Sequence, residues 1–130
     1  MIFALLVHDT PIGRQSSQAA YRFACEVLAR GHTLFRVFFF ADGVHNSTRL
    51  NVPQGNEANL PQLWSELAEA HGIDLVSCIG SALRRGIVDA TEASRHDLAG
   101  ASLRDGFELS GLGQLVEAHI RCDRLVVFGG

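Results

Sequence analysis

Ile73-Asp-Leu-Val-Ser-Cys-Ile-Gly-Ser-Ala-Leu-Arg-Arg-Gly86 is the stretch around which the rest of the chain is organised. It opens as an apolar run, which predicts a buried strand over residues 73–78, and small residues that can start a helix follow at once. Cys78 stands where the apolar run ends. A thiol at such a junction lies at the carboxyl end of a parallel strand, in front of free helix N–H groups whose positive partial charge favours the thiolate.

The residue pattern leaves two interpretations of Cys78 open. Free cysteine is among the most buried residue types, so an unreactive structural thiol is one of them. The other is a functional thiol, because the last residue of a strand before a helix lies at the edge of the sheet, where chemistry gathers in parallel α/β proteins.

Strands and amphipathic helices alternate along the whole chain. Apolar runs predict strands over residues 2–7, 34–40 and 123–128, with a short strand over 107–109. Apolar residues at helical spacing predict two long helices, one with the stripe Ala20, Phe23, Ala24, Val27 and Leu28, and one with the stripe Leu60, Leu63, Trp64, Leu67 and Ala68. A serine of the pair 16–17 is expected to cap the first, and the capping-box spacing of residues 89–92 predicts a short helix through Arg95. This alternation favours an α/β fold with a parallel sheet between helices.

A last helix is expected after residue 110. Ser110 is predicted to cap it, and its inward stripe is predicted to comprise Leu112, Leu115, Val116, His119 and Ile120. His119 is then a core histidine.

Three segments are expected to meet at the carboxyl edge of the sheet: the loop after Val7, the long loop over residues 41–58, and Cys78 itself. His8 and His45 lie on these loops, so either could serve Cys78 as a base or hydrogen-bond partner. Arg84 and Arg85 could stabilise a thiolate or dock an acidic partner, although a solvated helix end is the simpler interpretation.

No other motif indicates a cofactor. Cys25 and Cys122 are expected to be structural, and no C-x-x-C pair is present. The six histidines show no metal-ligand spacing, and the segment 111–113 lacks the third glycine of a dinucleotide fingerprint. The segment 13–17 is at best a poor phosphate loop. We expect neither a metal nor an organic cofactor.

Bulk composition limits the class of protein. The 130 residues, 47% of them hydrophobic, predict one domain spanning residues 1–130. A net charge of −3 without a basic cluster argues against direct nucleic-acid binding. Residues 1–7 are interpreted as a strand and not as a signal peptide, and no apolar run is long enough to span a bilayer. Three widely spaced cysteines favour a reducing compartment, so the expected location is the cytoplasm.

The chain resembles the DsrE/TusD family of small sulfur-transfer proteins nearly from end to end. The resemblance rests on three groups of residues: 37–44 with Asn46; Cys78 with Ala82, 84–89, Glu92 and Ala93; and 110–118. It implies a three-layer α/β/α sandwich with a mostly parallel five-stranded sheet, DsrEFH-like and flavodoxin-like in topology.

The same resemblance implies a function. Cys78 matches the family's sulfur-carrying cysteine, which accepts sulfane sulfur as a persulfide from an upstream carrier and hands it to a downstream one. Family members work in a heterohexamer with two related small subunits, TusB/TusC-like or DsrH/DsrF-like. TusD-like proteins feed 2-thiouridine formation at the tRNA wobble position, whereas DsrE-like proteins serve dissimilatory sulfur oxidation. The segment 112–123 with Cys122 favours the TusD-like setting.

Two functions of other classes compete with a sulfur relay. One is a flavodoxin-like module that binds a nucleotide or flavin at the same edge, which requires a better phosphate loop after Val7. The other is a non-catalytic assembly subunit whose partner does the chemistry.

Overall fold

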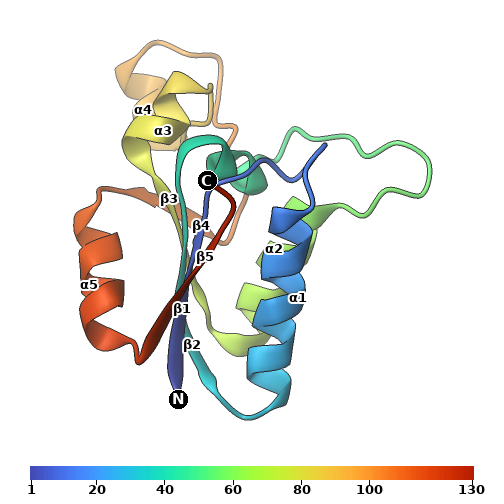
Figure 1. The fold of residues 1–130 in the computed structure, drawn as a ribbon. Helices are drawn as coiled ribbons and strands as arrows, with labels where there is room; N and C mark the ends of the chain where they lie inside the picture. The colour runs from blue at the N-terminus through green and yellow to red at the C-terminus, as the bar shows by residue number, and fades with distance from the viewer.

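The computed structural model describes residues 1–130 and shows one five-stranded sheet between helices (Figure 1). The strands are β1 (Ile2–Val7), β2 (Thr33–Phe39), β3 (Asp74–Cys78), β4 (Phe107–Ser110) and β5 (Arg124–Phe128). Their spatial order is β4-β3-β2-β1-β5, and all four pairings are parallel. The predicted mostly parallel sheet is therefore parallel throughout.

Helices cover both faces of the sheet. They are α1 (Ser16–Ala29), the 3-10 helix η1 (Ala41–Ser47), α2 (Leu60–His71), α3 (Ile79–Arg84), α4 (Ala90–Arg95) and α5 (Gly113–Arg121). Figure 1 shows α1 and α2 on one face, α5 on the other, and α3 and α4 beyond the carboxyl ends of the strands. The predicted three-layer α/β/α sandwich is confirmed.

The strand order differs from the flavodoxin order in one respect. In flavodoxin the second and third strands flank the first. Here β2 and β5 flank β1, because the chain moves outward through β2, β3 and β4 before β5 returns to the other side of β1. The fold class is as predicted, whereas the flavodoxin-like detail of the topology is not.

The face covered by α1 and α2 contains the main hydrophobic core. Alternate strand residues such as Leu5, Val37 and Leu75 point into it and are almost fully buried. Trp64 of α2 lies fully buried among them, with its ring edge-to-face against that of Phe39 at 5.5 Å. Burial of side chains of this size stabilises the fold by roughly 1.5–3 kcal/mol each, which explains why the apolar stripe of α2 faces the sheet.

The opposite face contains a much smaller core. Its fully or nearly fully buried members are Phe38, Val76 and Cys78, and Leu6, Phe40 and Leu115 pack against them while partly exposed. Only α5 lies over this face (Figure 1).

The predicted inward stripe of α5 is wrong. Leu112, Val116 and Ile120 are 52%, 57% and 75% exposed, and His119 is exposed too. Ala118 is the only fully buried residue of the helix, and Leu115 is the one member of the predicted stripe that packs on the sheet. A small residue at the contact lets the helix lie close to the strands, while the large apolar residues point to solvent.

Two predicted serine caps are also wrong. Ser110 is the last residue of β4, and Leu112 precedes α5 without a side-chain cap. The hydroxyls of Ser16 and Ser17 donate to the side chain and backbone carbonyl of Asp9 instead of capping α1. The cap predicted for the short helix is confirmed, because Asp89 accepts from the backbone N–H of Glu92 at 2.8 Å.

A buried arginine links α5 to the sheet. Nε of Arg36 donates to Asp74 at 2.6 Å, and Nη1 donates to the backbone oxygen of Gln114 and to the carboxylate of Glu117, both at 2.8 Å. Burial alone would lower the pKa of the Arg36 guanidinium, but the hydrogen bonds to Glu117 and Asp74 outweigh it and raise that pKa. The hydrogen bond from Arg36 in turn holds the pKa of the Glu117 carboxyl below its ordinary value.

This ion pair predicts a pH-dependent contribution to stability. A carboxyl whose pKa is lowered in the folded state stabilises the fold above its unfolded pKa, and the contribution disappears as pH falls through the folded pKa. We expect the free energy of unfolding to exceed that of Glu117→Gln by a constant amount above about pH 5, with the difference shrinking between about pH 5 and pH 3. Chemical denaturation across this range measures it. Glu26→Gln, which alters an exposed pair with Arg30, is the control, and equal pH profiles for wild type and Glu117→Gln would contradict the prediction.

Candidate active site

Cys78 is both the last residue of β3 and the residue that precedes the first turn of α3. It lies two residues after Val76 and therefore on the same face of the sheet, the one covered by α5. It belongs to the small core with Phe38 and Val76, against which Leu115 packs, and only 7% of the residue is exposed. The predicted position at the carboxyl edge of the sheet is confirmed, but the thiol is largely covered.

Neither predicted histidine makes a hydrogen bond to Cys78. The His8 ring lies edge-to-face against Phe40 at 5.7 Å, and Phe40 packs against the small core that contains Cys78. One aromatic ring thus separates His8 from that core. His45, in η1, lines a different hollow together with Thr10 and Leu50.

Two helix N-termini lie at the same edge as the thiol. The helix α3 starts directly after Cys78. Cys78 is also paired in register with Ser110 on β4, and α5 begins only three residues after Ser110. Neither helix has an acidic residue in its first turn. The partial positive charges of these N-termini are therefore not neutralised, and they favour a negative charge nearby.

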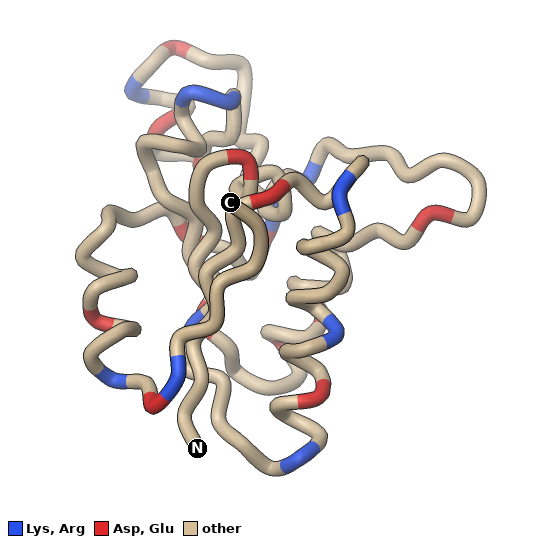
Figure 2. Tube along the Cα trace, in the orientation of Figure 1, with Lys and Arg blue, Asp and Glu red and all other residues tan.

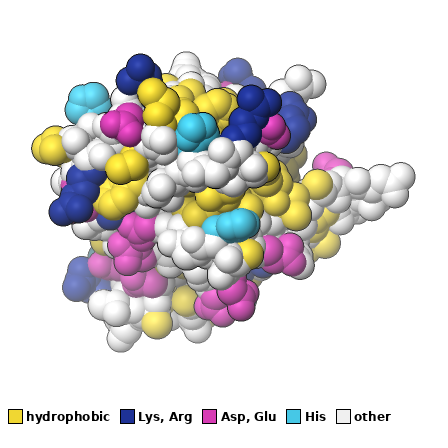
Figure 3. Space-filling view, turned by 90° about the horizontal axis from the view of Figure 1, so that it is seen from below, with side chains coloured by type: hydrophobic (Ala, Val, Ile, Leu, Met, Phe, Trp, Pro, Cys, Tyr) yellow, Lys and Arg dark blue, Asp and Glu magenta, His cyan; other side chains and the backbone are white.

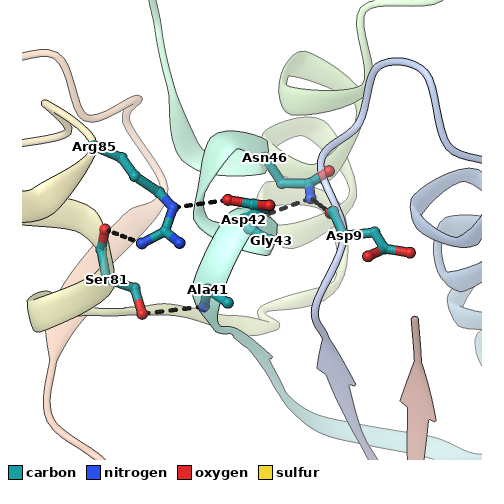
Figure 4. A network of polar contacts seen from close by, with 7 residues as sticks. All are labelled: Asp9, Ala41, Asp42, Gly43, Asn46, Ser81 and Arg85. Carbon is teal, nitrogen blue, oxygen red and sulfur yellow. Dashed lines mark hydrogen bonds and ion pairs between the residues drawn. The ribbon is translucent and has the colours of Figure 1, made fainter. Parts of the chain in front are cut away.

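Polar contacts fasten α3 to η1 (Figure 4). The backbone N–H of Ala41 donates to the hydroxyl of Ser81 at 3.0 Å, and Ala41 itself has a positive φ of 51°. Arg85 donates to the carboxylate of Asp42 at 2.9 Å and to the backbone oxygen of Ser81 at 3.1 Å. Arg85 therefore has a structural role, because it links α3 to η1. Arg84 is exposed and forms no ion pair, which leaves it available at the end of α3.

A buried asparagine joins the neighbouring loops. The side-chain amide of Asn46 donates to the backbone oxygens of Gly43 at 2.9 Å and of Asp9 at 3.3 Å (Figure 4). It also donates to the hydroxyl of Ser17 at 3.2 Å. Its oxygen accepts from the indole of Trp64 at 3.3 Å. All donors and the acceptor of this fully buried amide are used. It therefore fixes three segments relative to one another, namely the loop that follows β1, the 3-10 helix η1 and the helix α2.

The sequence did not predict the roles of Ser81, Asp42 and Asn46. The available signals were weak: a serine in the first turn of a short helix, and two polar residues in the loop that follows an apolar strand. Their partners are on segments distant in the sequence, so the contacts follow only once the order of the strands is known.

The other cysteines lie away from this site. Cys25 is in α1 and Cys122 follows α5, and both are partly buried and free. Cys122 lies at the end of the sheet opposite Cys78. Figure 3 views the molecule from that end and shows hydrophobic side chains beside charges of both signs and histidines. Burial and a hydrogen bond with Cys25 raise the pKa of Tyr21 to about 12.

The structure has hollows away from Cys78, the largest of about 500 Å³ and lined by residues such as His32, Leu34 and His71. A hollow of about 170 Å³ lies beside the start of α1, lined by residues such as Pro11, Gly13 and Asn51. The volume of this hollow is below the roughly 300–1,000 Å³ typical of cofactor pockets, whereas the volume of the largest hollow lies within that range. No three His, Cys, Asp or Glu side chains are grouped so that they could hold a metal ion. None of the helices has both the length and the apolar character needed to cross a membrane.

The surface charge is mixed. All 11 basic residues are arginines, and Figure 2 shows them interspersed with the acidic residues along the chain. The predicted absence of nucleic-acid binding stays a prediction.

Comparison with known proteins agrees with the resemblance seen in the sequence. The model of the DsrE/DsrF-like family matches residues 1–128. DsrE of Allochromatium vinosum, named a sulfurtransferase, is 50% identical over 99% of both chains. A sulfurtransferase TusD homolog of Vibrio vulnificus is 46% identical, over 97% of this chain and 96% of that protein.

Solved structures show the same fold at lower identity. The ychN protein of E. coli superposes with a TM-score of 0.79 at 22% identity, covering 98% of this chain and 99% of that one. MTH1491 of Methanobacterium thermoautotrophicum gives a TM-score of 0.67 at 14% identity, covering 97% of both chains.

Proposed function

The chain belongs to the DsrE/DsrF-like family, and we propose that it is a sulfurtransferase that holds sulfane sulfur as a persulfide on Cys78 and passes it to another sulfur-carrier protein. The observation that supports this role most directly is the position of Cys78, at the carboxyl end of β3 and directly before α3. Both relatives with the higher identity are named sulfurtransferases.

The proposed reaction consists of two exchange steps. In the first, the Cys78 thiolate attacks the outer sulfur of a donor persulfide. A bond forms between Sγ and that sulfur, the bond between the sulfur and the donor breaks, and the donor leaves as a thiolate. In the second, an acceptor thiolate attacks the outer sulfur on Cys78, and the Cys78 thiolate leaves. Each step transfers a neutral sulfur atom and needs no external oxidant.

The proposed destination of the sulfur is 2-thiouridine at the tRNA wobble position, with dissimilatory sulfur oxidation as the second candidate. The TusD homolog supports the first and DsrE the second, at similar identities. Complementation separates the two. Restored wobble thiolation in a bacterial strain that lacks its TusD-like protein supports the first destination, and failure to restore it despite normal expression favours the second.

The proposed assembly is a cytoplasmic heterohexamer with two related small subunits, in which this chain makes no direct contact with nucleic acid. The exposed Val116 and Ile120 of α5, together with Leu112 just before it, support a protein contact, because large apolar residues on one exposed surface commonly mark an interface. Native mass spectrometry of the co-expressed subunits tests the stoichiometry.

Sulfur loading of the purified chain is the direct test of the proposed function. After incubation with a sulfane donor such as inorganic polysulfide, we expect the mass of one added sulfur atom on the peptide that contains Cys78. Cys25 and Cys122 serve as internal controls in the same digest. Loading spread evenly over the three cysteines, or no loading at all, would count against the proposal.

A further inference from the structure

We propose that the hydroxyl of Ser110 donates a hydrogen bond to the anionic sulfur of Cys78, which makes Ser110 a further catalytic residue of the proposed reaction. The inference rests on the proposed function, because it names the group that stabilises the Cys78 thiolate. That thiolate occurs in both steps, first as the attacking group and then as the leaving group. The proton stays on the serine oxygen throughout, so the bonds that form and break are those of the exchange itself.

The pairing of β3 with β4 places the two residues side by side. Cys78 is in register with Ser110, and this is the last pair of the two parallel strands. Neighbouring strands lie about 4.8 Å apart. Side chains of two paired residues that share a face are therefore direct neighbours.

The two side chains do share a face of the sheet. Leu75 is paired with Phe107, and both belong to the main core on the side of α1 and α2. Side chains alternate along a strand, and Cys78 and Ser110 each follow one member of that pair by three residues. Both therefore point to the opposite face, which is also the face of the small core that contains Cys78.

The neighbour of Cys78 on its other side is aromatic. Phe40 directly follows Phe39, which is paired in register with Ser77. The Phe40 side chain packs against the small core. A phenyl ring has no hydroxyl or amide to donate to a sulfur anion, so the hydrogen bond has to come from the β4 side.

The Ser110 hydroxyl is free for this bond. It does not cap α5 and has no acceptor elsewhere in the chain. The two serines that flank the thiol in sequence are already engaged. Ser77 donates to the hydroxyl of Ser47 at 2.9 Å, and Ser81 accepts from the backbone N–H of Ala41 at 3.0 Å. Ser110 is thus the serine at this edge whose hydroxyl is available to the sulfur.

The experiment measures the rate at which iodoacetamide alkylates Cys78 as a function of pH, in a background in which Cys25 and Cys122 are serine. We expect Ser110→Ala to move the midpoint of this profile up by about one pH unit, because the variant loses one hydrogen bond to the anion. The rate at neutral pH should fall about threefold, since the smaller thiolate fraction is partly offset by a higher nucleophilicity.

Ser110→Thr and Ser110→Val are the matched pair, because their side chains have nearly the same shape and only threonine has a hydroxyl. Threonine should keep the wild-type midpoint, and valine should shift it as alanine does. Looser packing alone would change the rate at every pH without moving the midpoint. Equal midpoints in wild type, Ser110→Ala and Ser110→Val would overturn the inference, and so would a threonine variant that shifts as far as valine.

The charged and titratable groups around the thiol are the same in all these variants. Ser94→Ala, at an exposed serine of α4, is the control and should leave the profile unchanged. The groups held constant are Asp74 on β3, Glu108 on β4, Arg36 on β2, His8 after β1, Asp42 and His45 in η1, and Arg84 and Arg85 at the end of α3.

Sulfur loading, measured separately, distinguishes the two proposals. A shifted midpoint without any sulfur bound to Cys78 would leave the hydrogen bond established and refute the proposed function. Loading on Cys78 with the same midpoint in all variants would refute only the role of Ser110.

Discussion

Replacing Gly43 by alanine is expected to destabilise the fold by about 3 kcal/mol or more. A Cβ at this position would overlap the carbonyl oxygen of Val7 and lie 2.8 Å from its carbonyl carbon and 3.3 Å from that of His8. These atoms are backbone at the end of a central strand, and the same carbonyl oxygen accepts a hydrogen bond from the N–H of Phe40 at 3.0 Å. Neither side can move away without breaking the pairing of β1 with β2.

Chemical denaturation of Gly43→Ala and Gly100→Ala provides the matched comparison. Nothing lies within 4 Å of a Cβ at position 100, and its φ is not positive, so that substitution should change the free energy of unfolding by less than about 0.5 kcal/mol. If Gly43→Ala remained within about 1 kcal/mol of wild type, the close approach of η1 to β1 would not be a constraint of the fold.

The close approach of Gly43 to the backbone of Val7 also affects the candidate site. Gly43 lies between Asp42, which holds Arg85 of α3, and Asn46, which holds the loop after β1. A shift of η1 would therefore move α3 as well, and with it the turn that follows Cys78. For this reason we expect partly folded variants at position 43 to lose the geometry of the candidate site before they lose the sheet.

The strands could be predicted from the sequence because burial in the sheet favours mostly apolar runs, although Arg36 interrupts the second run and Glu108 interrupts the fourth. The position of Cys78 followed from the same rule, since the run stops there. Its degree of exposure could not be predicted, because it depends on packing with residues from other segments of the chain, such as Phe38 of β2.

The orientation of α5 shows why helical periodicity alone did not predict which face of this helix packs on the sheet. Helical spacing identifies which residues share a face, but it does not say which face meets the sheet. Arg36, the one charged residue in the second apolar run, contained the missing information. It points to the α5 side and takes the backbone oxygen of Gln114 and the carboxylate of Glu117 as partners. In this orientation Ala118 is buried, and Val116 and Ile120 are exposed.

Replacing Cys78 by serine is expected to abolish sulfur loading and to lower sulfur transfer by about a thousandfold or more. Serine has nearly the same shape, but its hydroxyl stays protonated at neutral pH and forms no persulfide. Because Cys78 packs among apolar side chains, serine will also cost some stability. Cys78→Ala, which leaves no polar group in this core, should show the same loss of transfer and so separates the chemical effect from the structural one.

Cys25→Ser and Cys122→Ser are the matched controls, since each removes a partly buried thiol elsewhere in the chain. Both should load sulfur at the wild-type rate, as judged by the mass of the intact protein after incubation with polysulfide. The decisive comparison is between substitution and deletion in the assembled relay. If Cys78→Ser and Cys78→Ala supported full sulfur transfer while loss of the whole chain abolished it, the chain would be an assembly subunit and the sulfur would be transferred by a partner. If both variants were as defective as the deletion, transfer would depend on this one sulfur atom.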